Sequence, residues 1–343
     1  MNAFLCTIIG LLSLSPPYYI CHQTPRAPQI DGKSEAVWEQ VPWTERFIDI
    51  EGNPDKQAPL DTRLKMLWDD AGLYFLARLE EPHLQASLTE RESVIFKDND
   101  FEIFIDPDGD GHLYYEYEIN ALGTEWDLLM AKPYRDGGPA ITAWDIEGVQ
   151  SAVYLAGSLN DPSDTDQYWQ VEIFFPWRSL LECASPKRVP REGEQWRINF
   201  SRVQWEWSVR QGRYEKKKDP QTAKALPESN WVWAPQGKIN MHMPEKWGYL
   251  QFSTQEAGAG AVAFIEDVDQ DRKAQLWELY YQQRDYRFKH GHFAQELKTL
   301  KAPLDLKLKI EASPHQYEIS IPSAQKKGRW IINQEGKLFF LPL

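Results

Sequence analysis

Residues 98–127 read DNDFEIFIDPDGDGHLYYEYEINALGTEWD, and this stretch decides the fold. Apolar and polar residues alternate on both sides of a central acidic segment that contains two glycines. Alternation with a period of two is typical of a β-strand, whose successive side chains point to opposite faces. Because Asp, Pro and Gly favour turns, the stretch predicts a β-hairpin with Phe101 and Ile103 on one face and Glu102 on the other. Such a face holds carboxylates and aromatic rings rigidly, which suits hydroxyl-rich ligands.

The same alternation recurs along the chain. Thr62 to Trp68 and Leu73 to Glu80 predict a second hairpin with a four-residue turn. Further strands are expected at 152–155, 168–175, 195–205 and 247–252. Many short strands separated by turn signals predict a mainly β protein, folded as an antiparallel, jelly-roll-like β-sandwich. The segments 121–150 and 206–246 lack a clear period, and we expect them to be long loops, which often carry function.

Composition and charge divide the chain. We expect a sandwich domain at 17–253, a linker of small residues at 254–265 and a small α+β module at 266–343, in which a helix precedes four strands. Residues 1–265 carry a charge balance of −15 and residues 266–343 one of +2, which supports two units. The total of −13 excludes nucleic acid and anionic membrane surfaces as expected partners.

An apolar run from Ala3 to Leu14 lies near the start of the sequence. It is too short to span a bilayer as a helix, and serines and prolines follow it. We therefore predict a signal peptide at 1–16 and an exported protein, periplasmic, at the cell surface or secreted, whose mature chain does not insert into a membrane. A buried first strand is the alternative. If the signal peptide is removed, Cys6 is lost and Cys21 and Cys183 remain, and the sequence leaves their pairing open.

Four short motifs, in this order, carry a resemblance to a known family. They are Ile30-Asp31-Gly32 before Trp38, Leu67-Trp68-Asp69-Asp70 before Leu73-Tyr74, Asp100 to Asp106, and Trp247-Gly248-Tyr249-Leu250. Over residues 20–253 the chain resembles carbohydrate-binding module family 9 and its relatives. The resemblance implies a β-sandwich that binds sugars without cleaving them, often attached to xylan- or cellulose-degrading enzymes. It also implies bound calcium.

The resemblance also implies site residues. Two aromatic rings sandwich a terminal sugar in well-known members, and the matching positions are Phe96 and either Trp231 or Trp233. The family glutamate corresponds to Glu102, and the asparagine before the second ring corresponds to Asn230. A basic residue that contacts sugar hydroxyls in those members falls near Glu118 here. This departure puts recognition of a free reducing end in doubt.

The chemistry of these residue types fits a sugar. A flat ring buries the apolar C–H face of a pyranose, and its hydroxyls need polar partners such as carboxylates, amides or guanidinium groups. Asp100, Asn120 and Arg202 join Glu102 as candidates because they lie on or next to the expected face. The alternative is structural: packed rings in a core, and a surface charge at Glu102.

Asp106, Asp108 and Asp110 alternate in the turn of the first hairpin. Calcium binds several oxygen ligands, so this spacing predicts a calcium site made of three carboxylates. The alternative is a solvated turn, since the downstream glutamate of an EF-hand is missing. We expect no organic cofactor.

The sequence thus predicts a non-catalytic carbohydrate-binding protein that serves extracytoplasmic carbohydrate catabolism, in association with polysaccharide-degrading enzymes. A glycoside hydrolase is the first alternative, although no nucleophile, metalloprotease or nucleotide-binding motif appears. A haem-binding electron-transfer domain, with ligands from Met241-His242-Met243, is the second alternative. An assembly protein whose sandwich binds other proteins is the third.

Overall fold

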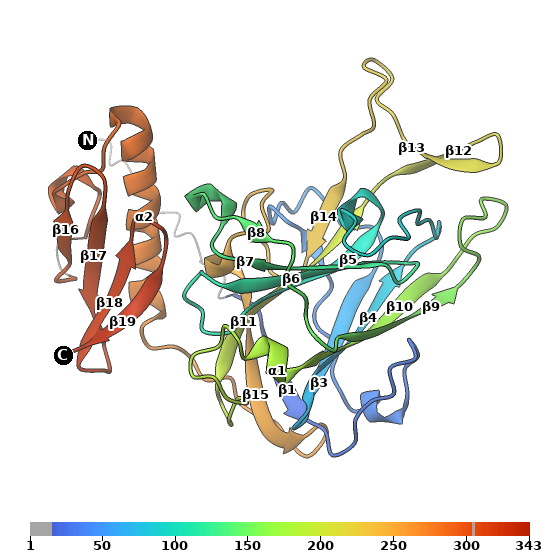
Figure 1. Cartoon of the computed structure of the whole chain (residues 1–343), viewed down its shortest axis with the longest axis horizontal. Helices are drawn as coiled ribbons and strands as arrows, with labels where there is room; N and C mark the ends of the chain where they lie inside the picture. Colours follow the sequence, from blue (N-terminus) through green and yellow to red (C-terminus); the bar gives the residue numbers. More distant parts are fainter. Residues whose placement is uncertain (1–15, 304–305) are drawn as a thin grey trace, which may run out of the picture.

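The computed structural model describes residues 16–303 and 306–343, and its larger part is a β-sandwich (Figure 1). The predicted hairpin is present: β5 (Asp100–Asp106) and β6 (Tyr114–Asn120) pair antiparallel, with Ile103 opposite Tyr117. The predicted mainly β fold is therefore confirmed. Nearly all of the predicted signal peptide lies outside the described residues.

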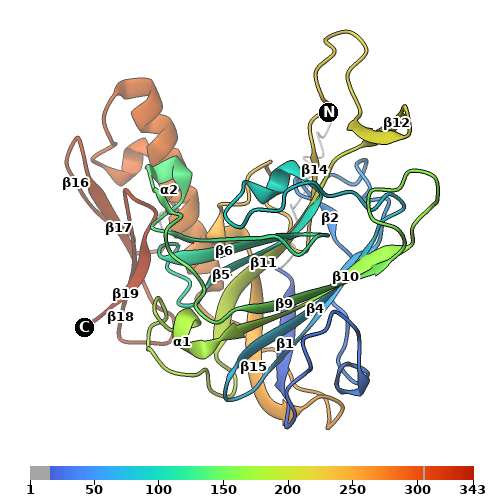
Figure 2. The ribbon, with the colours of Figure 1, turned by 45° about the vertical axis from the view of Figure 1, so that its right-hand side comes forward.

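One continuous sheet of 13 strands folds back on itself into two layers (Figure 2). The first layer contains, in order, β8 (Ala140–Ile141), β7 (Glu125–Met130), β6, β5 and β11 (Gln195–Gln204). β14 (Ser229–Val232) also pairs with β11, and β2 (Ile48–Asp49) pairs with β14. The second contains β15 (Gly248–Glu256), β1 (Tyr18–Gln23), β3 (Thr62–Trp68), β4 (Gly72–Glu80), β10 (Tyr168–Pro176) and β9 (Gln150–Ala156). β1 runs parallel to β15 and β3, whereas β4 pairs antiparallel with both β3 and β10.

Aromatic side chains fill the space between the layers. Phe200 of β11 lies at its centre, with ring centroids 6.0 Å from Phe75 of β4 and 6.1 Å from Phe101 of β5. All three side chains are buried. The alternation read from the sequence places Phe101 here, because β5 turns every second residue towards the opposite layer. Phe200 therefore joins strands of both layers.

The segment that leads into the second layer is held by one buried carboxylate. Glu172 of β10 accepts hydrogen bonds from the backbone N–H groups of Asp31 and Gly32 at 3.0 and 2.9 Å. It also accepts one from Nε1 of Trp38 at 2.8 Å. Gly32 has a φ of +79°, and a Cβ there would lie 2.8 Å from the backbone of Tyr154, so glycine is required. This explains why the Ile-Asp-Gly turn and the tryptophan occur together.

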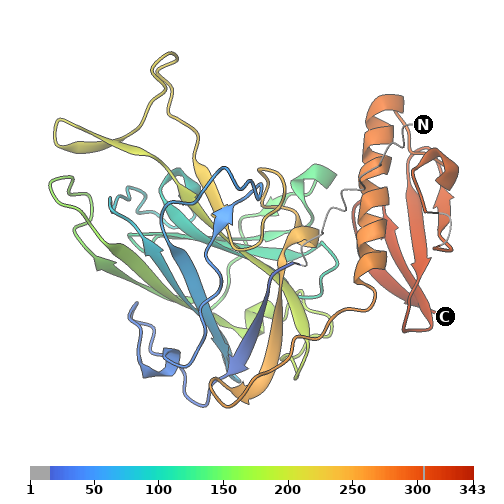
Figure 3. The ribbon, with the colours of Figure 1, turned by 180° about the vertical axis from the view of Figure 1, so that it is seen from behind.

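The C-terminal module has its own hydrophobic core. Helix α2 (Gln270–His290) packs against β16 (Lys309–Ala312), β17 (Tyr317–Pro322), β18 (Gly328–Asn333) and β19 (Leu338–Pro342). Gly291 ends the helix with a φ of +78°. The helix lies between its sheet and the sandwich (Figure 3). There Arg284 pairs with Asp136 at 2.6 Å, and Tyr280 donates to the same carboxylate.

Two expectations about irregular segments are wrong. The segment 121–150 contains β7, whose pairing with β6 extends the first layer. The segment 206–246 contains β14 and a projecting hairpin of β12 (Trp207–Arg210) and β13 (Arg213–Lys216). Short period-two stretches inside these segments were hidden by flanking glycine, proline and charged residues. β15 also extends to Glu256, which lies inside the predicted linker.

Short helices occur in the connections. They are η1 (Ala36–Trp38), η2 (Ile95–Lys97), η3 (Tyr134–Asp136), α1 (Trp177–Leu180), η4 (Pro244–Lys246) and η5 (Leu297–Thr299). Within residues 16–303 and 306–343, no helix combines the length and the apolar character needed to cross a bilayer. Cys21 and Cys183 are both free thiols in the structure.

The segment before β15 covers the outer face of the first layer. Trp247 packs against Phe104 and Tyr114 with ring centroids 5.7 and 5.3 Å apart. Met241 and Met243, two of the three candidate haem ligands, are buried in the protein. The third, His242, has its Nδ1 atom 2.9 Å from the Tyr114 hydroxyl. The three side chains thus serve packing in this structure.

The central position of Phe200 predicts a large loss of stability on truncation. Phe200→Ala should lower the free energy of unfolding by about 3–5 kcal/mol, because it leaves a cavity between the layers. Phe288→Ala is the matched control, since Phe288 is 92% exposed on α2 and its loss should change little. Denaturant unfolding of both variants measures this. Equal midpoints would contradict the packing between the layers.

Burial of His242 predicts a pH dependence of stability. Desolvation, and then the charge of Arg135, lower the pKa of His242 from 6.5 to about 4. Because the unfolded state takes up this proton near pH 6.5 and the folded state does not, the contribution of His242 is lost as the pH falls from 6.5 towards 4. The groups that face the ring are Tyr114, Glu116, Tyr134 and Arg135.

Comparison with His242→Asn isolates this effect from other titrations. Asn keeps a polar group near the Tyr114 hydroxyl but carries no proton that titrates in this range. Between pH 7 and pH 4, wild type should lose up to roughly 3 kcal/mol relative to the variant. Urea unfolding at both pH values gives the difference. A difference that stays constant with pH would show that the folded protein accepts a proton on His242 normally.

Candidate functional site

Both tryptophans predicted to stack on a sugar are buried. Trp231 is 6% exposed and Trp233 is 3% exposed. Trp231 lies opposite Arg202 in the pairing of β14 with β11, and both side chains belong to the inner side of the first layer. Trp233 packs against Phe200 of the core. Neither ring is therefore open for stacking on a sugar in this structure, because Trp231 lies on the inner side of β14 and Trp233 packs against the core.

The predicted polar residues divide between the two faces of the first layer. Asp100, Glu102 and Asn120 lie on the outer face, as expected, but all three are buried. Arg202 lies on the inner face, where its guanidinium pairs with Glu81 at 3.1 Å and donates to Thr62 Oγ1 at 2.9 Å. Arg202 therefore stabilises the interior, and it is not grouped with the other three.

Phe96 and Asn230 are the predicted site residues that reach the surface. Phe96 is 38% exposed and Asn230 is half-buried. The backbone N–H of Phe96 donates to Glu118 Oε2 at 3.0 Å, and its carbonyl accepts from Trp205 Nε1 at 2.9 Å. The contacts of these two residues with a ligand stay a prediction.

The three carboxylates of the predicted calcium loop lie close together. One carboxylate oxygen from each of Asp106, Asp108 and Asp110 lies within 4.8 Å of the others. Asp106, however, already accepts from the backbone N–H groups of Gly109 and Gly111, both at 2.9 Å. Asp110 pairs with Lys337 of the C-terminal module at 3.0 Å. A divalent ion would compete with these partners, and calcium at this loop stays a prediction.

A pocket on the opposite layer combines aromatic and charged side chains. It has a volume of about 360 Å³ and lies on the outer face of β3, β4 and β10, next to the segment that carries Trp43. This volume lies within the range of small-molecule sites. Its lining consists of Trp43, Asp61, Arg63, Arg78, Glu80, Gln167 and Tyr168. We call it the Trp43–Tyr168 pocket.

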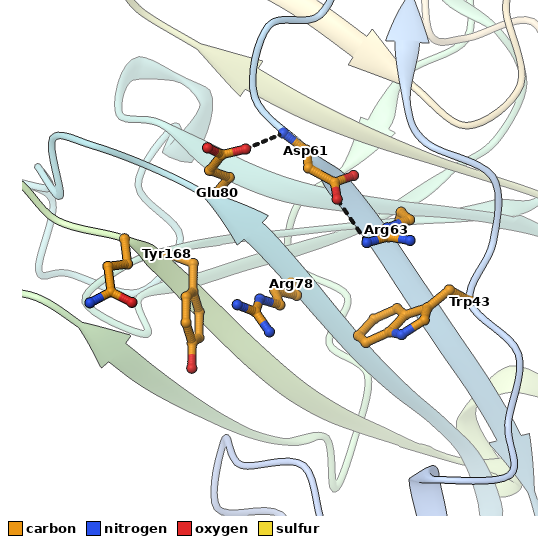
Figure 4. A pocket seen from close by; sticks show the side chains of 7 residues that line it. Trp43, Asp61, Arg63, Arg78, Glu80 and Tyr168 are labelled. Carbon is orange, nitrogen blue, oxygen red and sulfur yellow. Dashed lines mark hydrogen bonds and ion pairs between the residues drawn. The ribbon is translucent and has the colours of Figure 1, made fainter.

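The strands position the polar side chains of this pocket. Arg63 of β3 lies directly opposite Arg78 of β4, and Glu80 lies opposite Tyr168 of β10. These residues alternate with buried ones, so all four point away from the core. Trp43 lies in the segment that connects η1 to β2. Arg78 lies between the rings of Tyr168 and Trp43 (Figure 4).

Ion pairs and cation–π contacts fix the groups inside the pocket. The guanidinium carbon of Arg78 lies 3.8 Å from the Tyr168 ring centroid, and that of Arg63 lies 5.7 Å from the Trp43 ring centroid. Asp61 pairs with Arg63 at 2.8 Å, and Glu80 accepts from the Asp61 backbone N–H at 3.0 Å. The pocket therefore presents hydrogen-bond donors and acceptors between two partly exposed rings.

A second pocket adjoins the first. It has a volume of about 590 Å³ and is lined by residues of the segments 46–48 and 52–61 together with Glu80. Asp61 and Glu80 line both pockets. The two volumes therefore form neighbouring parts of one surface, with room for an extended ligand.

Part of this site was visible in the sequence. The alternation of the second predicted hairpin places Arg63 and Arg78 on the outer side of a half-buried sheet. Trp43 and Tyr168 carry no comparable signal, because most of the 15 tryptophans and 15 tyrosines are expected in the core. Only the tertiary structure brings Trp43 and Tyr168 close to these two arginines.

Several known proteins share sequence or structure with this chain. Over 171 residues, half of this chain, the sequence is 27% identical to Exoglucanase XynX of Acetivibrio thermocellus, and the match spans only 13% of that protein. Two solved structures of a carbohydrate binding module family 9 from Caldicellulosiruptor kristjanssonii, in complex with cellotriose and with glucose, are each 17% identical with a TM-score of 0.46. The structural alignments include 73% and 71% of this chain, respectively, and 100% of each family 9 chain.

A known family matches part of the sequence. Residues 30–189 match the family described as carbohydrate family 9 binding domain-like. The match begins at the Ile30-Asp31-Gly32 turn and extends beyond β10, so it contains the seven residues that line the Trp43–Tyr168 pocket. Residues 30–189, just under half of the chain, are thus similar to the carbohydrate family 9 binding domain-like proteins.

Proposed function

We propose that the β-sandwich binds carbohydrate without cleaving it, and that the Trp43–Tyr168 pocket is the binding site. The observation that carries this proposal is the arrangement of two partly exposed aromatic rings around paired arginines and carboxylates. The family match at 30–189, which contains the whole lining of the pocket, supports the same ligand class.

The rings would bind the apolar faces of sugar units. A pyranose presents C–H groups on its flat side, and burying them against an indole or phenol ring removes apolar area from water. Trp43 and Tyr168 come from separate segments and are already held in place by neighbouring cations. A preorganised ring loses little conformational freedom when a ligand binds, so more of the contact energy contributes to affinity.

The charged groups would bind hydroxyls at the edge of the sugar. A guanidinium donates from several N–H groups in a fixed plane, and a carboxylate accepts from adjacent hydroxyls. Arg78 and Glu80 are exposed on β4 and line the pocket, so their remaining donors and acceptors face a ligand there. Asp61 lines both adjoining pockets and can contact more than one sugar unit. An oligosaccharide therefore fits this surface better than a single sugar.

The Phe96 surface is the alternative location for the same function. The acids predicted to support it, Asp100 and Glu102, are buried on the outer face of the first layer, whereas the polar groups of the Trp43–Tyr168 pocket line an open cavity. We therefore place the site at the pocket, and the variants below compare the two locations directly.

We also propose that this binding supports carbohydrate breakdown outside the cytoplasm, beside polysaccharide-degrading enzymes. The apolar run at 3–14 supports export, and the sequence similarity to an exoglucanase supports the association. Cell fractionation with an antibody against the protein tests the location. Recovery of the protein in the cytoplasmic fraction alone would contradict it.

Truncating either ring should weaken binding strongly. Trp43→Ala and Tyr168→Ala should each lower the affinity for cello- or xylo-oligosaccharides by roughly 10- to 100-fold, because each removes a stacking surface. Phe96→Ala is the matched control, since it removes a partly exposed ring from the other layer. Isothermal titration calorimetry with each variant measures the affinities. If Phe96→Ala abolishes binding and the pocket variants keep it, the site is at Phe96.

Turnover separates binding from catalysis. We expect the protein to leave cello-, xylo- and pectic oligosaccharides intact over hours at micromolar protein, because Asp61 is engaged by Arg63 and is not poised as an acid–base partner of Glu80. Chromatography of the incubated sugars tests this. Steady product formation that is lost in Glu80→Gln would instead identify a glycoside hydrolase.

A further inference from the structure

The Trp43–Tyr168 pocket and the pocket that adjoins it carry an excess of positive charge on an acidic protein. The two linings contain the acids Asp61 and Glu80 and the cations Arg46, Lys56, Arg63 and Arg78. Lys56 pairs with Glu51, which lies outside both linings. One positive charge therefore remains in excess, whereas the whole chain carries −13. A local charge opposite in sign to the net charge favours an anionic ligand at this surface.

Two of these cations face each other across a pair of strands. Arg63 of β3 lies directly opposite Arg78 of β4 on the outer face of the second layer. Like charges in this position repel each other and destabilise the strand pair. Asp61 pairs with Arg63 at 2.8 Å and with Arg46 at 3.3 Å. Asp61 is thus shared by two arginines, and neither of them is Arg78.

Arg78 forms no ion pair and no side-chain hydrogen bond with any residue that the structure describes (Figure 4). Its guanidinium carbon instead lies 3.8 Å from the ring centroid of Tyr168. Glu80, two residues further along β4, accepts from the backbone N–H of Asp61. A guanidinium that lies over a ring keeps the N–H donors in its own plane available. Because Arg78 is exposed and lines the pocket, these donors are open to a ligand.

An anionic group on a sugar would satisfy this guanidinium better than a hydroxyl. A carboxylate accepts two parallel N–H bonds from an arginine, and oxyanions with several equivalent oxygens are bound in the same way. Hydrogen bonds between charged partners are roughly twice as strong as those between neutral partners. A bound anion would also offset the repulsion between Arg63 and Arg78, which a neutral sugar leaves in place.

We propose that the Trp43–Tyr168 pocket selects acidic oligosaccharides, and that Arg78 binds the carboxylate of a uronic acid unit or the sulfate of a sulfated unit. This inference rests on the proposed function and names the ligand class of the same site. Trp43 would bind the apolar face of a sugar unit next to the anion, since it lines the same cavity as Arg78. Arg78 is therefore a specificity-determining residue of the pocket.

Matched pairs of ligands test the inference on the full chain. Trigalacturonic acid is compared with the same trisaccharide after reduction of its carboxyl groups to alcohols, and cellotriose 6-sulfate is compared with cellotriose. Isothermal titration calorimetry should show that the acidic member of at least one pair binds about 10-fold or more tightly than its neutral partner. The two pairs distinguish a carboxylate from a sulfate as the source of the anion.

Variants of Arg78 assign the preference to this side chain. Arg78→Gln should bring the two affinities of the preferred pair close together, and Arg78→Lys should restore only part of the difference, because an ammonium lacks the planar set of donors. Arg210→Gln, at the exposed tip of the β12–β13 hairpin, removes the same charge and should keep the preference. Arg78 has no acidic partner to lose, so thermal unfolding should show the same midpoint for Arg78→Gln as for wild type.

The outcomes separate this inference from the proposed function. If the neutral trisaccharides bind as tightly as the acidic ones, the pocket binds carbohydrate without selecting charge, and only the inference fails. If an acidic trisaccharide is preferred but Arg78→Gln keeps the preference, the anion is bound elsewhere, and again only the inference fails. If no member of either pair binds, the proposed function of the pocket fails together with it.

Discussion

The pairing of β5 with β6 and β11 is the constraint on which the rest of the structure depends. A strand alternates its side chains between two faces, so the register that sends Phe101 into the core must send Asp100 and Glu102 to the outer face. A slip by one residue would exchange apolar and acidic side chains. The aromatic core and the acidic outer face are therefore two results of one register.

Much of this fold was predictable, because the strands have strong local patterns. Both hairpins and the turn residues between their strands were found in the sequence. β7 was missed, since its short alternating stretch lies between segments rich in glycine and proline. The burial of the outer face was also missed. It depends on η2 and on the segment around Trp247, which cover β5 and β6 from distant parts of the chain, and no local pattern records that contact.

The candidate site shows the same division between local and long-range information. Arg63 and Arg78 face outward because their strands alternate, and this could be read from the sequence. Trp43 and Tyr168 reach the pocket only because Glu172 anchors the segment before β3 and because β10 pairs with β4. Trp231 and Trp233 had the better sequence argument, yet their positions near β11 place them against the core. Residue type alone does not separate a packed ring from an exposed one.

Carbohydrate binding at the pocket lined by Trp43, Arg78 and Tyr168 on the second layer is the proposal on which the function depends. Nuclear magnetic resonance of ¹⁵N-labelled protein, titrated with cellotriose or xylotriose, tests it most directly, because each tryptophan Nε1–H gives its own signal. If carbohydrate binds at this pocket, the Trp43 indole signal and the backbone signals of Arg63, Arg78 and Tyr168 should shift with ligand concentration. Shifts confined to Trp205 and the backbone around Phe96 would contradict it.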